Sequence, residues 1–574
     1  MKLSSPQARA DASDLSRALI FILIAIIAAC VLRLTARESK PMHVDESTQA
    51  VKLHQLLEGE YEYDPRDHHG PTLLYSTVPI MALTGTRWID MTESKLRLVP
   101  ALYGIALVLL LVLVKDGMSR MSLAWAALFT AVSPLMVFYS RYYIMEVLLV
   151  VFTFGCIACG WRYYITRKNS WMAWSGICAG LMHATKETCV LHFMAMGAGL
   201  FVVYAAEFFT AGAGLTVVNR NRRSPLRARQ AMLWLGCAAG ASILCFSKCL
   251  TDWTAVWNSF NTYFLMLDRA GGQGHQKEFF YYLKLLWGGA LAASGSPSPE
   301  AAFLDFPRWL SRLGINPSPL MILTERVILI LSAIGAISAF VSKPGRQQTH
   351  HLLRFLAVYG VTTFVIYSSI SYKTPWCIMG AWHALILMAG LGAQVMVNAF
   401  LNRWARNIMM AILLVLTAHM GLMAWRTTQN FEKDSRLPYN YSMTSPDVRE
   451  WVARFTRFTE IDDKGIDLKI TQNDPNGGWP LPWYLRKFPN YQWQGGAMDI
   501  AGSSVLLVSA AADEVLKHQL EAAGQLGAFE AGFTKQSLTL HPSQSLTVYI
   551  DEALWQKYLA RAAEAPWPKL DVQQ

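Results

Sequence analysis

The apolar residues of the chain gather in long runs that short polar connections separate. A helix needs about 20 mostly apolar residues to cross ~30 Å of hydrocarbon, and eleven runs approach that length. The first run ends in basic residues instead of a small-residue cleavage site, so we interpret it as a membrane helix and not as a signal peptide. The eleven predicted transmembrane helices are 18–32, 96–114, 121–140, 143–161, 171–186, 189–209, 231–249, 322–342, 352–370, 376–398 and 404–424.

One further apolar run, 71–83, is short, and Pro71 and Pro79 interrupt it. If this run does not span and the N-terminus is cytoplasmic, every basic loop between helices falls on the cytoplasmic side, as the positive-inside rule requires. We therefore predict that 35–95 is one long outer loop with interfacial helices. The basic loops in question are 115–120, 162–170, 210–230, 343–351 and 399–406.

The same orientation places two later segments outside the membrane. One is a second outer loop at 250–321, and the other is the mixed polar segment 429–574. The latter alternates helix-like and strand-like stretches and is long enough for a small α/β domain. The predicted architecture is a polytopic all-α transmembrane domain at 1–428 followed by a soluble extracytoplasmic α/β domain at 429–574. We expect it in a prokaryotic cytoplasmic membrane.

Composition agrees with a lipid bilayer as the main partner. Hydrophobic residues make up 53% of the chain and charged residues 16%, against about a quarter charged in soluble domains. A net charge of +11 would suggest nucleic acid in a soluble protein. Here the basic residues lie in loops between apolar runs, so topology explains them and we predict no nucleic-acid partner. The nine cysteines lie in or beside apolar runs, which argues against a disulfide framework.

With this topology, ionisable side chains from four separate connections lie at one depth on the outer side. Charges beside hydrocarbon are costly and usually functional, so this convergence predicts a site. Its candidate members are His43, Asp45, Glu46, Asp64, Asp67, His68 and His69 in the first loop, Arg141 and Glu146, Lys186 and Glu187, and Tyr372 and Lys373.

Each member also has a simpler structural interpretation. Acidic residues favour helix N-termini, and a single lysine near a membrane commonly snorkels to the interface. The alternatives are that Asp45 and Glu46 cap an interfacial helix at 46–57, that Glu146 pairs with Arg141, that Lys186 and Lys373 snorkel, and that His68 and His69 are ordinary loop residues.

The chemistry that suits the whole set is glycosyl transfer from a lipid phosphate, whose transition state resembles an oxocarbenium ion. A phosphate leaving group needs cations and no general acid, and Lys186, Arg141, Lys373 and the first-loop histidines are candidates. The acceptor hydroxyl needs a carboxylate base, for which we choose Asp45. Glu146 would orient the acceptor or balance the cations, and a polyprenyl tail would lie between helices.

These residues resemble a known family. The stretch "MHVDESTQAVKLHQLLEGEYEYDPRDHHGPTLLY" is similar to the first outer loop of the GT-C glycosyltransferases, which include protein O-mannosyltransferases and the bacterial lipid A aminoarabinose transferase. "ESKLRLVPALYG", "SRYYIMEVLLV" and "ATKETCVL" resemble later segments of that superfamily. "HHGPTLLY", "YKTPWCIMG" and "WPLPWYLRKF" together resemble a prokaryotic subfamily usually labelled flippase activity-associated. The similarity covers nearly the whole chain.

The resemblance implies a GT-C fold, a polyprenyl-phosphate sugar donor and inversion at the anomeric carbon. It carries the catalytic base onto Asp45, the second acid onto Glu146 and phosphate binding onto Lys186. The chain departs from the aminoarabinose transferase, which has a lysine where His68 and His69 stand here, and its second acid is Glu instead of Asp. Oligosaccharyltransferases of the superfamily bind a divalent metal, but this chain has no Asp-x-Asp, so we predict transfer without metal or cofactor.

The resulting site assignment has three parts. We expect catalysis from Asp45, Glu46 and Glu146, donor-phosphate binding from Lys186, Arg141, His68, His69 and Lys373, and substrate contacts from His43, Tyr372, Glu187, Trp479, Trp483 and Arg486.

The motif "DPNGGWPLPWYLRKF" in the outer domain has two interpretations. Its aromatic and basic residues, Trp479, Trp483, Tyr484 and Arg486, would stack on and bind a sugar or acceptor. Alternatively, it is a Pro-rich turn that docks the domain onto the membrane region.

The competing function is a lipid-linked sugar flippase or a non-catalytic subunit of a glycan assembly system. A transporter would place polar groups near the bilayer midplane and show broken helices or inverted repeats. Here the polar residues lie at one edge, and His192 and His383 are single residues that suit helix–helix contacts. The sugar, the acceptor (glycan, lipid or protein) and the lipid length stay open.

Overall fold

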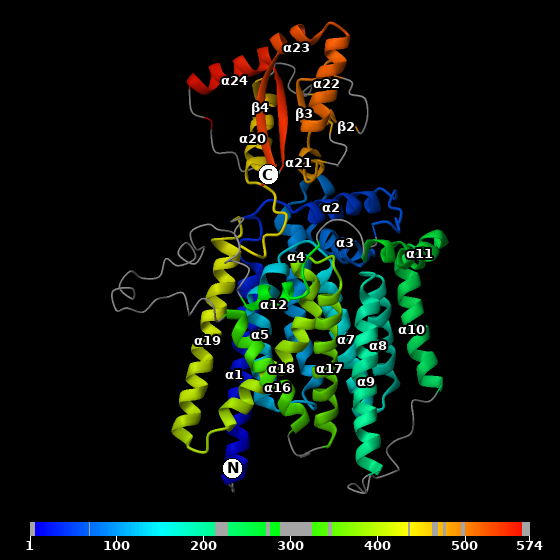
Figure 1. The fold of residues 1–574 in the computed structure, drawn as a ribbon, viewed down its shortest axis with the longest axis vertical. Helices are drawn as coiled ribbons and strands as arrows, with labels where there is room; N and C mark the ends of the chain where they lie inside the picture. The colour runs from blue at the N-terminus through cyan, green and yellow to red at the C-terminus, as the bar shows by residue number, and fades with distance from the viewer. Residues whose placement is uncertain are drawn as a thin grey trace, which may run out of the picture.

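The computed structural model describes residues 6–67, 69–212, 228–270, 276–287, 324–341, 347–433, 437–461, 469–473, 478–494, 500–542, 544–564 and 567. Long, roughly parallel helices form a bundle, and the C-terminal domain stands on one end of it (Figure 1). The N-terminus lies at the opposite end. This arrangement agrees with the predicted topology, in which the two ends of the bundle face different compartments.

Each of the eleven predicted transmembrane segments overlaps a long helix, and one of them, 121–140, is divided between two helices. Seven helices in the described residues are long and apolar enough to cross a membrane, so the chain is a multi-pass membrane protein, and the full number of spans stays a prediction. The helices are α1 (Pro6–Leu34), α4 (Glu93–Leu110), α5 (Arg120–Val132), α7 (Glu146–Thr166), α8 (Asn169–His183), α9 (Cys189–Gly212), α10 (Ala228–Phe246), α16 (Thr324–Val341), α17 (Gln347–Ser369), α18 (Met379–Asn398) and α19 (Arg403–Gln429).

The predicted run 121–140 is broken into two helices. Helix α5 ends at Val132, and the short α6 (Pro134–Tyr139) begins one residue later. Proline has no N–H for the helical ladder and restricts the residue before it, so Pro134 begins a new helix at its first position. The chain from Ser140 to Met145 then turns into α7, which brings the start of that helix under the first outer loop.

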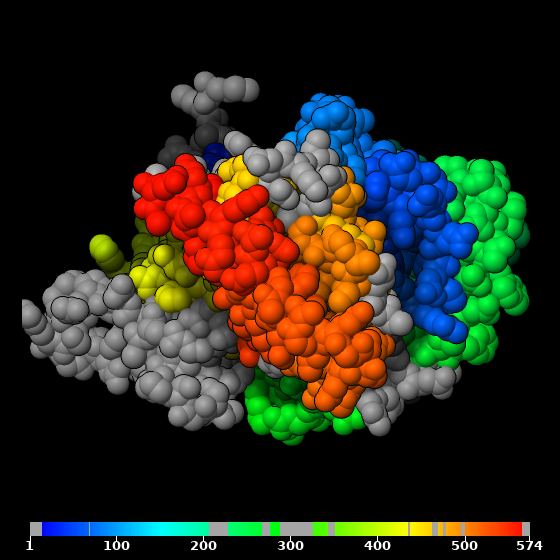
Figure 2. All heavy atoms as spheres, turned by 90° about the horizontal axis from the view of Figure 1, so that it is seen from above, coloured from blue at the N-terminus to red at the C-terminus, as the bar shows by residue number. Residues whose placement is uncertain are grey.

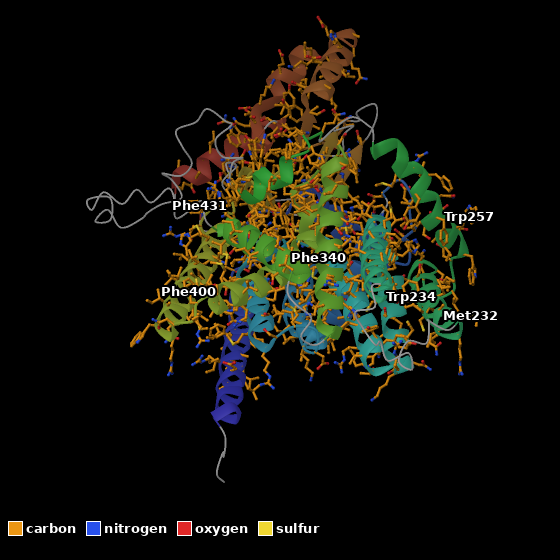
Figure 3. All side chains as sticks on the ribbon, turned by 60° about the horizontal axis from the view of Figure 1, so that its bottom comes forward. Met232, Trp234, Trp257, Phe340, Phe400 and Phe431 are labelled. Carbon is orange, nitrogen blue, oxygen red and sulfur yellow. The ribbon has the colours of Figure 1, made fainter. Side chains whose placement is uncertain are left out.

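Apolar side chains cover the outside of the bundle as well as its interior. Trp125 and Trp382 are fully buried between helices. On the outer surface of the bundle, Met232 and Phe340 are 64% and 45% exposed, and Met232 lies at the edge of the structure (Figure 3). So many large apolar groups facing outward are stable when hydrocarbon surrounds them, since lipid tails are as apolar as the side chains.

The first outer loop contains two helices, α2 (Val44–Leu57) and α3 (Thr72–Thr84), and the 3-10 turn η1 (Trp88–Asp90). Helix α2 lies across the end of the bundle that carries the C-terminal domain (Figure 1). The doubtful run 71–83 is the 13-residue α3, which is too short to cross ~30 Å of hydrocarbon. In the second outer loop, the described part holds α11 (Trp253–Ala270) and α12 (Tyr281–Trp287); residues 288–323 lie outside it.

The C-terminal domain is the expected small α/β domain. Its five strands are β1 (Ile470–Asn473), β2 (Tyr491–Gln494), β3 (Val505–Ser509), β4 (Phe533–His541) and β5 (Gln544–Asp551), in the order β2-β1-β3-β5-β4. Strand β1 pairs in parallel with β2 and β3, and β5 pairs antiparallel with β3 and β4.

Helices cover both faces of this sheet. Val505 and Leu507 of β3 pack with α20 (Asp447–Ile461) and α24 (Glu552–Glu564). Leu506 and Val508 face α22 (Ala510–Ala522) and α23 (Leu526–Gly532). A strand segment buried on both faces is expected to be apolar on both, and Val505–Val508 of β3 is apolar at four successive positions. Viewed from above, the domain covers the middle of the bundle end, and the first outer loop, in blue, emerges beside it (Figure 2).

Candidate functional site

The N-terminus of α2 is organised by His43. Its ring nitrogen Nδ1 accepts a hydrogen bond from the backbone N–H of Asp45 at 3.1 Å. The backbone N–H of His43 donates to Glu46 Oε2 at 2.8 Å. Its Nε2 lies 3.0 Å from the carbonyl oxygen of Tyr441. Because Nδ1 accepts and a carbonyl cannot donate, these partners assign the neutral tautomer with the proton on Nε2.

This neutral histidine leaves the Asp45 carboxylate without a cationic partner beside it. The carboxylate lies 4.0 Å from His43 Nδ1, and its side chain is 41% exposed. Burial lowers the pKa of His43, since water no longer solvates the charged ring. Asp45 is therefore accessible from outside and is not neutralised by its neighbour.

Glu46 is fully buried and paired with Arg97. The guanidinium donates from Nε to Oε1 and from Nη2 to Oε2, both at 2.7 Å. Oε1 also accepts from the backbone N–H of Tyr143 at 2.8 Å. Burial alone would raise the pKa of Glu46, but the charges of Arg97 and Lys40, together with the hydrogen bonds from Arg97 and the backbone of His43, outweigh burial and lower the pKa to about 2. A carboxylate with this many donors is a structural anchor, so the geometry favours positioning over the catalytic role predicted for Glu46.

Glu146 opens α7 three residues after Tyr143, and it pairs with Lys186. The Lys186 Nζ donates to Glu146 Oε1 at 2.7 Å, and the two side chains are only 8% and 5% exposed. Among the described residues, Oε2 of Glu146 is buried without a hydrogen-bond partner. The alternative that Glu146 merely pairs with Arg141 is wrong, and Lys186 does not snorkel alone.

The Lys186 segment docks onto the "HHGPT" motif of the first outer loop. His69 and Lys186 form an isolated antiparallel bridge, and the N–H of Gly70 donates to the carbonyl of Thr185 at 3.0 Å. A Cβ on Gly70 would lie 2.0 Å from the carbonyl oxygen of Ala184, so this close approach requires glycine. His69 Nδ1 also lies 3.7 Å from Glu187 Oε2. His68 lies outside the described residues.

A narrow cavity joins these groups. Its lining includes Glu146, Lys186, Thr188, His192, Tyr367 and Trp376. The Trp376 ring also meets the His43 ring edge to face, with 5.5 Å between the centroids. Trp376 therefore lies between the capped start of α2, which carries Asp45, and the Glu146–Lys186 ion pair.

Three predicted site residues point elsewhere. Arg141 donates to the carbonyls of Leu32 and Ala36 at the end of α1 and lies 4.0 Å from Glu432. Lys373 donates to the carbonyls of Ile370 and Lys277, and the backbone of Tyr372 bridges to Gln276 in the second outer loop. None of the three predicted residues Arg141, Tyr372 and Lys373 lines the cavity.

The "WPLPWYLRKF" motif lies in the interface between the C-terminal domain and the first outer loop. Trp483, which is 2% exposed, packs edge to face on Trp88 at 5.5 Å between centroids. Arg486 stacks on Trp483 and donates to the carbonyl of Met91 at 2.6 Å. Trp479 packs on Trp493 within the domain. These contacts favour the docking interpretation over the sugar-binding one.

A second set of polar contacts strengthens the same interface. The hydroxyl of Tyr484 donates to Glu93 at the start of α4 and accepts from the backbone N–H of Met42 at 2.8 Å. Arg449 of α20 also pairs with Glu93. The C-terminal domain thus contacts the first outer loop within a few residues of His43 and Asp45.

Sequence reasoning missed several residues at the cavity. Trp376 stands inside "YKTPWCIMG", a motif that was noticed only as a resemblance. Tyr367 is a polar residue in an apolar run, and His192 was interpreted as a helix–helix contact. All three residues have a side chain that can form hydrogen bonds, and they stand in or beside an apolar run. Polar side chains inside a membrane are usually functional, so this feature could have identified them from the sequence.

Comparisons with known proteins place the fold. The family model for dolichyl-phosphate-mannose-protein mannosyltransferases matches residues 84–211, which contain Glu146 and Lys186. The structure of ArnT from Cupriavidus metallidurans bound to undecaprenyl phosphate superposes with a TM-score of 0.54 at 14% identity, over 94% of this chain and 99% of that one. The chain has a GT-C fold. No curated protein matches it.

Other GT-C enzymes superpose as well. The oligosaccharyltransferase AglB from Archaeoglobus fulgidus, in complex with an inhibitory peptide and a dolichol-phosphate, gives a TM-score of 0.50 at 11% identity. The match covers 94% of this chain and 77% of that one. The predicted GT-C resemblance and fold class are confirmed, whereas the flippase activity-associated subfamily stays a prediction.

No metal site is evident in the part of the GT-C chain that the structure describes, since no three His, Cys, Asp or Glu side chains there are grouped to hold an ion. Metal-independent transfer stays a prediction.

Proposed function

We propose that this protein is a membrane glycosyltransferase that moves a sugar from a polyprenyl-phosphate donor to an acceptor on the side of the C-terminal domain. The observation that carries the proposal is the Glu146–Lys186 pair, buried in a cavity that Trp376 connects to the capped Asp45 helix. The match of the mannosyltransferase model over this region supports it. Relatives of the same fold bind undecaprenyl phosphate and dolichol-phosphate.

Lys186 binds the donor phosphate. An ammonium group has three N–H donors, and the structure uses one of them on Glu146. The two others are free to donate to phosphate oxygens, and partial burial strengthens a charge-assisted bond. The nearby His69 is the second candidate for phosphate contact, whereas Arg141 and Lys373 hold the surrounding backbone.

Asp45 is the general base. The acceptor hydroxyl attacks the anomeric carbon from the face opposite the phosphate, and the bond between that carbon and the phosphate oxygen breaks. The bonding electrons leave with the polyprenyl phosphate, and the hydroxyl proton passes to the Asp45 carboxylate. The configuration therefore inverts. Glu146 Oε2 accepts a hydrogen bond from a hydroxyl of the sugar or the acceptor.

Glu46 acts through the backbone. Because it binds both Arg97 and the N–H of Tyr143, it ties the start of α2 to the start of α7. Asp45 precedes Glu46 directly, and Glu146 follows Tyr143 by three residues. Glu46 is thus a positioning residue that sets one carboxylate relative to the other.

The orientation follows from charge. Basic loops such as 115–120 and 399–406 lie at the end of the bundle with the N-terminus, away from the C-terminal domain (Figure 1). By the positive-inside rule that end is cytoplasmic, so the site faces the extracytoplasmic side of a prokaryotic membrane. The acceptor is a glycan, lipid or protein of that compartment.

The test uses purified protein in lipid nanodiscs with a panel of labelled polyprenyl-phosphate sugars. Wild type is expected to transfer or release the sugar with inversion, and Asp45→Asn is expected to lose at least about 100-fold in kcat, in line with the loss of a general base. Glu58→Gln, an exposed carboxylate at the other end of α2, serves as the matched control with unchanged activity.

A flippase would behave differently in the same preparation. In liposomes, lipid scrambling by wild type that survives Asp45→Asn, together with no transfer from any donor, would replace the enzyme proposal with the transport alternative.

A further inference from the structure

Polar side chains of two helices, α9 and α17, meet in one part of the cavity wall. His192 of α9 points its Nε2 toward the hydroxyl of Tyr367 on α17, at 3.4 Å. Its other ring nitrogen, Nδ1, lies 2.8 Å from the hydroxyl of Tyr359, which precedes Tyr367 by about two turns of α17 and does not line the cavity. His192 is 1% exposed and Tyr367 is 5% exposed.

The two ring nitrogens of His192 differ in the length of their hydrogen bonds. The contact with Tyr359 has ordinary hydrogen-bond length, whereas the contact with Tyr367 is at the long limit. A tyrosine hydroxyl both donates and accepts, and an imidazole nitrogen does one or the other. On the cavity side, Tyr367 also lies beside Thr188, another residue of the cavity lining, so the polar atoms that face the cavity here belong to His192, Tyr367 and Thr188.

Gly380 fixes the position of this ring. It stands in the "YKTPWCIMG" motif, at the start of α18, and lines the same cavity. A Cβ on Gly380 would lie 2.4 Å from His192 Cε1, so any larger residue would push the ring out of place. Tyr359 on one side and Gly380 on the other hold His192 in a single orientation toward the cavity.

We propose that His192 and Tyr367 recognise a polar substituent of the donor sugar, a hydroxyl or amino group on the edge of the ring away from the phosphate. The inference rests on the proposed function, because Lys186 at the same cavity holds the phosphate. The cavity is narrow, which suits one hydroxyl-sized group better than a whole ring. The sugar is consequently one that carries such a group, and its deoxy analogue at that position is a poor donor.

The experiment compares a polyprenyl-phosphate hexose with its deoxy analogues, each lacking one ring hydroxyl. Wild type is expected to discriminate against one analogue by at least about tenfold in kcat/KM, the size of one hydrogen bond made in a buried site. Tyr367→Phe is expected to lose discrimination at that position alone while using the deoxy donor as well as wild type does. Gly380→Ala, which displaces His192, is expected to show the same loss.

Tyr164→Phe is the matched control, because it removes a hydroxyl from another tyrosine–histidine contact, with His351, that does not line the cavity, and it is expected to retain selectivity. Variants that keep wild-type selectivity at every position, or that lose activity equally with all donors, would overturn the inference and leave the transferase proposal intact.

A binding measurement separates this inference from the proposed function. Affinities of bare polyprenyl phosphate and of the sugar-bearing lipid are measured by titration in nanodiscs, with no turnover required. Tighter binding of the sugar-bearing lipid, lost in Tyr367→Phe, upholds the recognition site even if no transfer occurs. Equal affinities for the two lipids in wild type would refute it.

Discussion

Glu46 accepts a hydrogen bond from the backbone N–H of Tyr143 at 2.8 Å, across 97 residues of sequence. Through this bond, the residue next to the proposed base holds the turn that presents Glu146 and, with it, Lys186. Asp45 and Glu146, the two acidic residues that match the pattern of the superfamily, are therefore linked through this hydrogen bond. A substitution of Glu46 is therefore expected to disturb the Glu146–Lys186 ion pair.

Removal of the Glu46 carboxylate should destabilise the protein strongly. Glu46→Ala leaves the fully buried Arg97 without its counter-charge, and breaking such a pair costs about 3–5 kcal/mol. Unfolding of the detergent-solubilised protein, followed by tryptophan fluorescence during denaturant titration, measures the loss. The double variant Glu46→Leu with Arg97→Met should be less destabilised than Glu46→Ala, since it leaves no unpaired charge. A Glu46→Ala protein as stable as wild type would contradict the anchoring role.

The Glu46–Arg97 pair also predicts that the stability of the protein falls at acid pH. The pKa of Glu46 is lowered to about 2 in the folded protein, from an ordinary value of 4.5. A depressed carboxylate pKa contributes stability that is fully present above pH 4.5 and is lost as pH falls toward 2. Thermal unfolding between pH 6 and pH 2 should show this decline in wild type. The Glu46→Gln variant should lose less over that range; an identical slope in the two proteins would refute the assignment.

Lys186→Met should weaken binding of polyprenyl phosphate. The variant removes the ammonium group and leaves Glu146 with an unpaired negative charge that repels the phosphate, so we expect the Kd to rise at least about tenfold. Lys186→Met with Glu146→Gln should recover part of the loss, because the repulsion is gone. Lys373→Met, which changes a buried lysine that does not line the cavity, is the control. Unchanged affinity in folded Lys186→Met would exclude the phosphate role.

Trp483→Ala should loosen the C-terminal domain from the membrane bundle. Truncation of a fully buried tryptophan costs about 3–5 kcal/mol, and here the loss falls on the contact with Trp88 and Arg486. Limited proteolysis of the segment after α19 should become several-fold faster. Trp493→Ala, at a tryptophan that is 47% exposed, should change it little. If Trp483→Ala instead abolished sugar binding with the domain still docked, the motif would be a substrate site.

Local patterns were enough for the membrane helices and for the nature of the outer domain. Length and apolarity of a run are properties of about 20 neighbouring residues, so the apolar runs were found to be helices with their approximate ends, whereas the number that cross the membrane stays a prediction. The break at Pro134 was missed because apolarity continues across it. The convergence of Asp45, Glu146 and Lys186 at one end followed from topology, which the distribution of basic loops indicated.

The choice of partners did not follow from local patterns. Arg141 was predicted to bind the donor phosphate, with pairing to Glu146 as the alternative. In the structure, Arg141 binds the carbonyl of Ala36 and lies near Glu432, and Lys186 from the next connection pairs with Glu146. Glu46 was predicted to be catalytic, but both of its carboxylate oxygens accept hydrogen bonds from Arg97. In each case several residues of suitable charge were available, and sequence distance did not distinguish among them.

The sequence by itself determined that this chain crosses a membrane many times and which superfamily it resembles, and it predicts the side that its acids and cations occupy, because these depend on local apolarity, short motifs and loop charge. The tertiary structure decided which carboxylate stays free, which is locked in an ion pair, and that the aromatic motif of the outer domain lies in an interface. Those outcomes depend on helix packing, since a charge next to hydrocarbon takes whatever partner the fold brings within hydrogen-bond distance.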